Sequence, residues 1–175
     1  MKVLPATLLS ALMVACFTVA AFAQGNPRGT TTITPRGKKI SIEYGRPSLK
    51  GRSTDELLGQ LPSGSYWRMG ADTSTTLTTG TDLVFPNAVV PAGVYSLWLQ
   101  RAVDATTWNL VVNKQHGQWG TQHDESQDLV FVPLKQAKAA KSIETLTETL
   151  GRARDGGTIT IQWGTMVLSA SFKAK

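Results

Sequence analysis

Most of the chain alternates apolar and polar residues at the spacing of short β-strands. Ile40, Ile42 and Tyr44 alternate with Ser41 and Glu43, and this period of two is typical of a strand with one buried face. The same alternation recurs in three later segments, 95–99 (YSLWL), 108–112 (WNLVV) and 159–163 (ITIQW). The pattern therefore predicts an antiparallel all-β fold.

Clusters of Gly, Asp and Pro separate these apolar runs. Pro91-Ala92-Gly93 precedes one strand segment, and Asp155-Gly156-Gly157 precedes another. These residue types supply the backbone angles that reverse a chain. The sequence contains no internal repeats, and its length suits one domain. We expect a single antiparallel β-sandwich-like domain over residues 32–175, after a flexible leader over residues 24–31 (QGNPRGTT).

The segment 139–150 (AAKSIETLTETL) does not fit the strand pattern. Ile143, Leu146 and Leu150 lie at helical spacing, whereas the Thr and Ser content favours neither a long helix nor a clean strand. Periodicity leaves helix and strand open. The Gly-rich turn at 155–157 favours a hairpin with the segment that follows, and so a strand.

The first 23 residues have the pattern of a cleaved export signal. Lys2 gives a positive start, residues 8–22 are apolar, and Ala21-Phe22-Ala23 has the small-x-small form of a signal peptidase site. The apolar run is shorter than the ~20 residues that span a bilayer. Lipid attachment at Cys16 is the alternative, although the residues after Cys16 stay apolar. We expect a periplasmic or extracellular protein with no integral membrane segment in the mature chain.

Cysteine content and charge limit the kinds of chemistry and the binding partners that are possible for this chain. Cys16 is the only cysteine, so cleavage after Ala23 leaves no disulfide, thiolate nucleophile or cysteine metal ligand. The net charge is +6, and Glu43 is the only acid among seven basic residues between Arg28 and Arg52. This stretch either forms a patch for an anionic polymer or is simply a solvated face. Nucleic acid is not expected as a partner, because only one aromatic residue is interleaved with these charges.

Two loops carry the candidate ligand-binding residues. In residues 66–76 (YWRMGADTSTT), Trp67 offers a flat face to a sugar ring, Arg68 binds a carboxylate or phosphate, and Asp72 is an acceptor or general base. In residues 44–52 (YGRPSLKGR), a second set of cations either solvates the loop or forms an anion cradle. The set is Arg46, Lys50 and Arg52.

The first of these loops also has a purely structural interpretation. Trp67 then fills the core, and Arg68 pairs with Asp72 to pin a turn. We expect a mixed outcome, in which Trp67 is structural while Arg68 and Arg46 lie at the rim of a shallow polar cleft.

A third group contains potential metal ligands, His116, His123 and Asp124. Imidazoles and carboxylates bind zinc. However, two histidines seven residues apart on a Gly-containing loop match no regular zinc pattern. We expect no metal and no other cofactor.

Five segments resemble, in the same order, the successive motifs of a bacterial family, the domain of unknown function 2911 (DUF2911). They are 44–52, 66–76, 91–97 (PAGVYSL), 108–120 (WNLVVNKQHGQWG) and 158–163 (TITIQW). The resemblance implies an exported, single-domain, β-sandwich-like protein with a hairpin near residue 150, and it carries no established activity. The chain departs from the family pattern with Asp72-Thr73 in place of Asn-Glu and with His123 in place of tyrosine.

Two functions are consistent with these observations. The first is a non-catalytic cell-envelope module that binds a carbohydrate or another anionic ligand, such as an anionic glycan or envelope polymer. The second is a small hydrolase or lyase that uses Asp72 with Arg68. The sequence favours the first, because no paired carboxylates, cysteine nucleophile, metal set or phosphate loop is visible.

Overall fold

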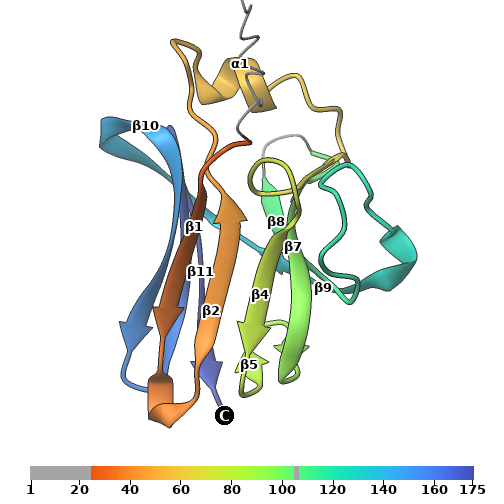
Figure 1. Cartoon of the computed structure of the whole chain (residues 1–175), viewed down its shortest axis with the longest axis vertical. Helices are drawn as coiled ribbons and strands as arrows, with labels where there is room; N and C mark the ends of the chain where they lie inside the picture. Colours follow the sequence, from red (N-terminus) through yellow and green to blue (C-terminus); the bar gives the residue numbers. More distant parts are fainter. Residues whose placement is uncertain (1–24, 105–106) are drawn as a thin grey trace, which may run out of the picture.

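The computed structural model describes residues 25–104 and 107–175, in which two antiparallel β-sheets pack together (Figure 1). The all-β prediction is confirmed. The strands are β1 (Arg28–Ile33), β2 (Ile40–Gly45), β3 (Tyr66–Trp67), β4 (Thr75–Thr79), β5 (Leu83–Val84), β6 (Val89–Val90), β7 (Gly93–Arg101), β8 (Trp108–Asn113), β9 (Asp128–Pro133), β10 (Lys135–Ala153) and β11 (Gly156–Ala174). The helical elements are α1 (Thr54–Leu58) and the 3₁₀ turns Pro35–Gly37 and Glu125–Gln127.

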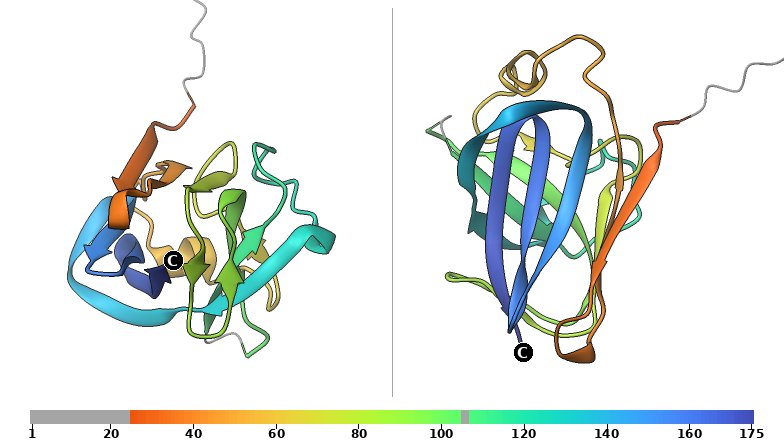
Figure 2. Two further views of the ribbon diagram at one scale, coloured as in Figure 1. Left: turned by 90° about the horizontal axis from the view of Figure 1, so that it is seen from below. Right: turned by 90° about the vertical axis from the view of Figure 1, so that its left-hand side faces the viewer.

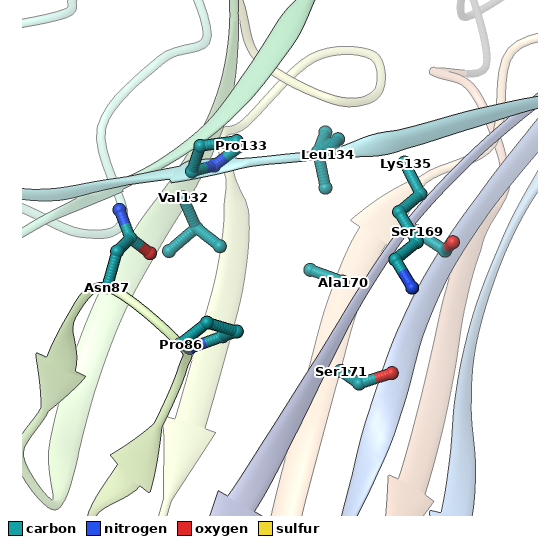
Figure 3. A pocket seen from close by; sticks show the side chains of 9 residues that line it. All are labelled: Pro86, Asn87, Val132, Pro133, Leu134, Lys135, Ser169, Ala170 and Ser171. Atoms are coloured by element: carbon teal, nitrogen blue, oxygen red, sulfur yellow. The ribbon is translucent and has the colours of Figure 1, made fainter.

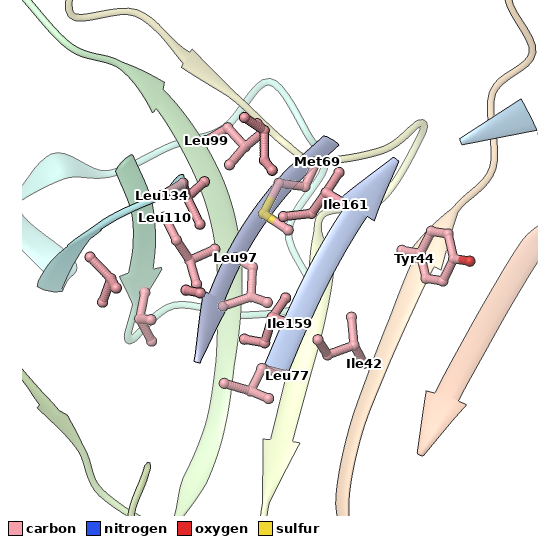
Figure 4. Packing of buried hydrophobic residues seen from close by; sticks show 14 of the residues in the cluster. Ile42, Tyr44, Met69, Leu77, Leu97, Leu99, Leu110, Leu134, Ile159 and Ile161 are labelled. Atoms are coloured by element: carbon pink, nitrogen blue, oxygen red, sulfur yellow. The ribbon is translucent and has the colours of Figure 1, made fainter. Parts of the chain in front are cut away.

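The first sheet has the order β1-β2-β4-β7-β8-β9, with β3 paired to β7, and the second has the order β10-β11-β5-β6. The apolar positions of the alternating segments face the space between the sheets. Ile42 pairs with Leu77 across β2 and β4, and both are fully buried. Figure 4 shows their side chains beside those of Leu97, Ile159 and Ile161 from the other strands. The hydrophobic core is therefore formed by the period-two positions that the sequence predicts.

The segment 139–150 belongs to strand β10, as the hairpin interpretation predicts. β10 pairs with β11 on both sides of a bulged stretch between Lys138 and Thr147, and it curves over one end of the sheet (Figure 2, right). Its buried face consists of Leu146, Glu148 and Leu150. Glu148 interrupts the apolar alternation, and this explains why periodicity alone left helix and strand open.

Strand β11 turns back on itself in its middle. Gly164 has a positive φ of 58°, a conformation that glycine adopts without steric cost. The two halves then lie side by side. The distance of 3.0 Å between Thr158 Oγ1 in the first half and Ser171 Oγ in the second shows this. The views in Figure 2 show this reversal within the second sheet.

The chain after β2 joins the two sheets. Leu146 N of β10 donates to Pro47 O at 2.9 Å, and Leu49 N donates to Glu144 O at 3.0 Å. Ser48 forms a bridge with Thr145 in the same place. The 44–52 motif therefore lies across the seam between the sheets, which fixes the position of its cationic side chains.

The structure differs from the sequence-based expectations in the leader at residues 24–31 and in the helix after residue 53. Residues 28–31 of the expected flexible leader belong to β1, where they pair with β2 from Arg28↔Gly45 onward. Helix α1 was not expected, although Ser53 and Glu56 form a capping box at its start.

The export signal over 1–23 and Cys16 lie outside the described residues. Within the described ranges, no helix has the length and apolar character needed to cross a bilayer.

Candidate functional site

A cleft of ≈ 350 Å³ lies beside α1 and contains residues from both candidate loops. Five separate parts of the chain line it, among them the loop after β2, helix α1 and the loop after β3. The lining residues that carry the argument are Lys50, Arg52, Trp67, Arg68 and Trp163. We call this region the α1 cleft.

Two stacked tryptophans form one wall of the α1 cleft. The rings of Trp67 and Trp163 lie 5.5 Å apart at an angle of 10°. Trp163 is buried, and its Nε1 donates to Glu144 O at 3.2 Å. Trp67 is half-buried and packs against the core, as the structural interpretation predicts, and it also lines the cleft. Trp163 was not singled out in the sequence, because its position in strand β11 indicated only a core residue.

Three cationic side chains line the α1 cleft, and no acidic residue among those that the structure describes does. Arg52 Nε donates to Leu49 O at 3.0 Å. The acid near Arg52 is Glu56, whose Oε2 accepts from Ser53 N at 2.5 Å in the capping box. Hydrogen bonds from Ser53 lower the pKa of Glu56, and the charge of Arg52 lowers it further. Glu56 is thus held at the start of the helix, and no ion pair links it to Arg52 in the described part of the chain.

Arg68 lines the α1 cleft, and one of its donor atoms is buried without a partner in the described structure. Its Nη1 donates to Gly120 O at 3.4 Å. Its Nε is buried and has no hydrogen-bond partner among residues 25–104 and 107–175. An unsatisfied buried donor next to a cleft is uncommon in folded proteins. A ligand acceptor in the cleft is one group that would satisfy it.

The backbone around the α1 cleft is unusual. Of the four non-glycine residues with positive φ in the described ranges, three are Lys50 (53°), Met69 (52°) and Asp72 (63°). Lys50 lines the cleft, and Met69 lies between two lining residues. Such conformations cost free energy and concentrate at functional sites. The surrounding contacts therefore maintain a loop geometry that the local sequence does not favour.

Two candidate residues, Arg46 and Asp72, lie outside the cleft lining. Arg46 Nε donates to Leu146 O at 3.4 Å, so this side chain spans the seam between the sheets. Asp72 Oδ2 accepts from Asn26 N at 2.8 Å. The expected ion pair between Arg68 and Asp72 does not form, because each contacts other groups.

The three potential metal ligands have different surroundings. His116 is exposed. His123 Nε2 lies 2.9 Å from Asp128 Oδ1, and Asp124 Oδ1 accepts from Ser126 N at 3.0 Å at the start of a 3₁₀ turn. Hydrogen bonds from the Ser126 hydroxyl and then from its backbone N–H lower the pKa of Asp124. Within the described ranges, no three His, Cys, Asp or Glu side chains are grouped to hold a metal.

The surroundings of His123 were not foreseen from the sequence. Its ring lies between those of Tyr66, 3.9 Å away, and Trp98, 4.7 Å away. Asn113 Nδ2 donates to Asp128 Oδ1 at 2.8 Å. Burial, together with the negative charge of Asp128, raises the pKa of Tyr66 to about 12. This His123 cluster fastens the loop between β8 and β9 to the first sheet.

No curated protein and no solved structure matches the chain significantly. A family model, described as a protein of unknown function (DUF2911), matches residues 26–172. This range includes every motif that carried the resemblance, as well as every residue that lines the α1 cleft. The chain therefore belongs to the DUF2911 family.

Proposed function

We propose that the protein is exported and that its α1 cleft binds a small anionic carbohydrate or a similar anionic envelope ligand. One observation carries the proposal: Lys50, Arg52 and Arg68 line the same cleft as a stacked tryptophan pair, and among the described residues no acid lines it. The three lining cations outnumber the two acids beside them, Glu56 near Arg52 and Glu144, whose Oε1 accepts from Lys50 N at 2.7 Å. The net positive charge favours an anion, and a concave surface concentrates the potential on it.

The chemistry of the lining groups suits a ligand with both a charge and a ring. An arginine guanidinium binds a carboxylate or phosphate through two parallel N–H donors. Arg68 Nε is buried without a partner in the described structure, so a hydrogen bond from this N–H to a ligand acceptor would remove a desolvation cost. Trp67 supplies an apolar surface next to these donors, and aromatic faces pack well against sugar rings.

The hydrolase or lyase alternative has less support. General acid–base catalysis requires a titratable group within hydrogen-bond reach of the substrate. Asp72 does not line the α1 cleft, and its carboxylate accepts hydrogen bonds from Asn26. Binding without catalysis is therefore the function that the geometry supports best.

A binding screen on residues 24–175 tests the proposal. We expect oligosaccharides of uronic acids to bind and the matching neutral oligosaccharides not to bind. Arg68→Ala and the double variant Lys50→Ala/Arg52→Ala should each weaken binding at least tenfold, and higher salt should weaken it further because the contacts are ionic.

Arg46→Ala is the matched control, since Arg46 belongs to the same motif but lies outside the lining. It should bind like the native protein once its folding is verified by a thermal melt. Equal binding of neutral and anionic sugars, or undiminished binding by the Arg68 variant, would contradict the proposal.

Export is tested separately by intact mass. The protein isolated from its natural host should begin at Gln24, with or without cyclisation of that residue. A lipid-modified Cys16 at the amino terminus would contradict cleavage after Ala23.

A further inference from the structure

A second cavity, of ≈ 390 Å³, lies where β9 passes into β10 (Figure 3). A neighbouring cavity of ≈ 430 Å³ shares Pro86 and Ser171 with it. We call the two together the seam groove, and it has no residue in common with the α1 cleft. Its lining includes Pro86, Val132, Leu134, Lys135, Ser171 and Lys173.

The seam groove coincides with a gap in the second sheet. Strand β10 pairs with one edge of β11 as far as Lys135↔Ser169. On the same edge, β5 begins to pair only at Val84↔Lys173. Residues 170–172 therefore have no partner strand on this edge within the described structure.

The alternation of the strand directs the main chain of Ser171 into this gap. Ala174 N donates to Asp155 O on one side of β11, and Lys175 N donates to Asp82 O on the other. Residues two apart on a strand direct their N–H and C=O groups to the same side. The N–H and C=O of Ser171 thus point to the β5 side, toward the groove.

The gap extends over three residues, so it offers few main-chain groups to a further strand, and the residues that flank it do not favour one. Pro86 and Pro133 lie on its two sides, and proline has no N–H with which to extend a sheet. A bound small molecule fits this geometry better than a bound peptide strand does.

The groove is apolar inside and cationic at its rim. Val132, Leu134 and Ala170 are buried core residues, and Figure 3 shows them around the space between the two sheets. Lys135 and Lys173 are exposed and line the groove. Within residues 25–104 and 107–175 neither lysine belongs to an ion pair, so both ammonium groups can contact a bound anion.

We propose that the seam groove binds a single-chain amphiphile with a carboxylate head, namely a medium-chain or long-chain fatty acid. The acyl chain lies over Val132, Leu134 and Ala170 in the space between the sheets. The carboxylate lies at the rim between Lys135 and Lys173, where Ser171 N–H is a further donor. The volumes of the two cavities, ≈ 390 and ≈ 430 Å³, both lie in the usual range for small-ligand sites, roughly 300–1,000 Å³.

Calorimetric titration of residues 24–175 with dodecanoate, below its micelle concentration, tests this inference. We expect saturable binding of one molecule per chain. Hexanoate should bind far more weakly, because each buried methylene contributes about fourfold in affinity. Lys135→Glu/Lys173→Glu should weaken dodecanoate binding at least tenfold and leave dodecanol binding unchanged, since dodecanol has no charge.

Two further variants separate the groove from general surface effects. Ser171→Phe places a large ring at the exposed mouth and should abolish binding of both dodecanoate and dodecanol. Lys114→Glu/Lys138→Glu makes the same charge change at exposed lysines outside the groove and should bind dodecanoate like the native protein.

Three results would overturn the inference. The first is the absence of saturable dodecanoate binding to the native protein. The second is equal dodecanoate affinity in the native protein and the Lys135→Glu/Lys173→Glu variant, or in the native protein and a folded Ser171→Phe variant. The third is retention of an extended peptide without fatty-acid binding, which would identify the gap as a strand-docking edge.

Discussion

The side chain of Arg68 passes so closely under Gly120 that position 120 has no room for a side chain. A Cβ atom there would lie 2.8 Å from Arg68 Nε and 2.6 Å from Asp72 O. Gly120 also donates its N–H to Asp72 O at 2.9 Å and accepts from Arg68 Nη1. The Trp-Gly pair of one motif thereby sets the position of the arginine in another.

Gly120→Ala should therefore destabilise the protein by about 1–3 kcal/mol, as overpacking does. Arg68→Ala in the same chain should relieve part of this loss, because it removes one of the two clashing groups. Urea unfolding of the single and double variants measures the coupling. Gly151→Ala is the control, since only Thr158 O lies within 4 Å of that position. Strictly additive losses would show that the contact does not constrain Arg68.

Trp67→Ala should cost about 2–4 kcal/mol, because it removes a half-buried ring together with its stacking on Trp163. Trp119→Ala is the matched control. That side chain is 53% exposed, so its loss should cost under about 0.5 kcal/mol. Thermal or urea unfolding gives both values. Similar losses for the two variants would mean that the stacked pair does not stabilise the cleft wall.

Glu148 should make stability depend on pH. Its side chain is 1% exposed, and neither carboxyl oxygen has a hydrogen-bond partner in the described structure. Burial raises its pKa well above the usual value of 4.5. The folded protein thus favours the neutral acid, whereas the unfolded chain ionises near pH 4.5.

The stability from neutral Glu148 is consequently complete below about pH 4.5 and declines as the pH rises toward the folded-state pKa. The slope from one such group is about 1.4 kcal/mol per pH unit. Glu148→Gln should remove this decline and be more stable than the native protein at pH 7. Glu144→Gln, on the exposed face of the same strand, should keep the decline. Unfolding free energies measured from pH 4 to 8 decide between these results.

His123→Ala should destabilise the protein by about 2–4 kcal/mol, through lost ring packing and the lost hydrogen bond to Asp128. His116 is exposed, and His116→Ala should change stability by less than about 0.5 kcal/mol. Chemical unfolding compares the two variants directly. Equal effects would mean that the His123 cluster does not fasten its loop.

Metal removal should have no effect on the purified protein. His123 already bonds to Asp128, and in the described ranges His116 belongs to no group of three potential ligands. A chelator is therefore expected to leave the melting temperature unchanged, and elemental analysis should find no stoichiometric metal. One zinc per chain, lost in a His116→Ala/His123→Ala variant, would contradict this prediction.

The sequence by itself determined the strands and the turns, because these depend on local alternation and on the backbone preferences of Gly, Pro and Asp. Ile40, Ile42 and Tyr44 are buried on one face of β2, as their spacing indicates. The expected hairpin is present, with Ala153 of β10 paired to Gly156 of β11 across a turn at residues 154–155. The capping box of Ser53 and Glu56 is a further local signal, and it would have revealed α1.

Only the tertiary structure decided which side chains meet. Arg46 and Arg52 belong to one motif, yet only Arg52 lines the α1 cleft. Trp163 reaches Trp67 from almost a hundred residues further along the chain, and Glu148 is buried although it is charged in water. These outcomes follow from the register and packing of long-range antiparallel strands. The register of the strands depends on many core contacts between segments that are far apart in the sequence. A short stretch of sequence therefore does not determine it.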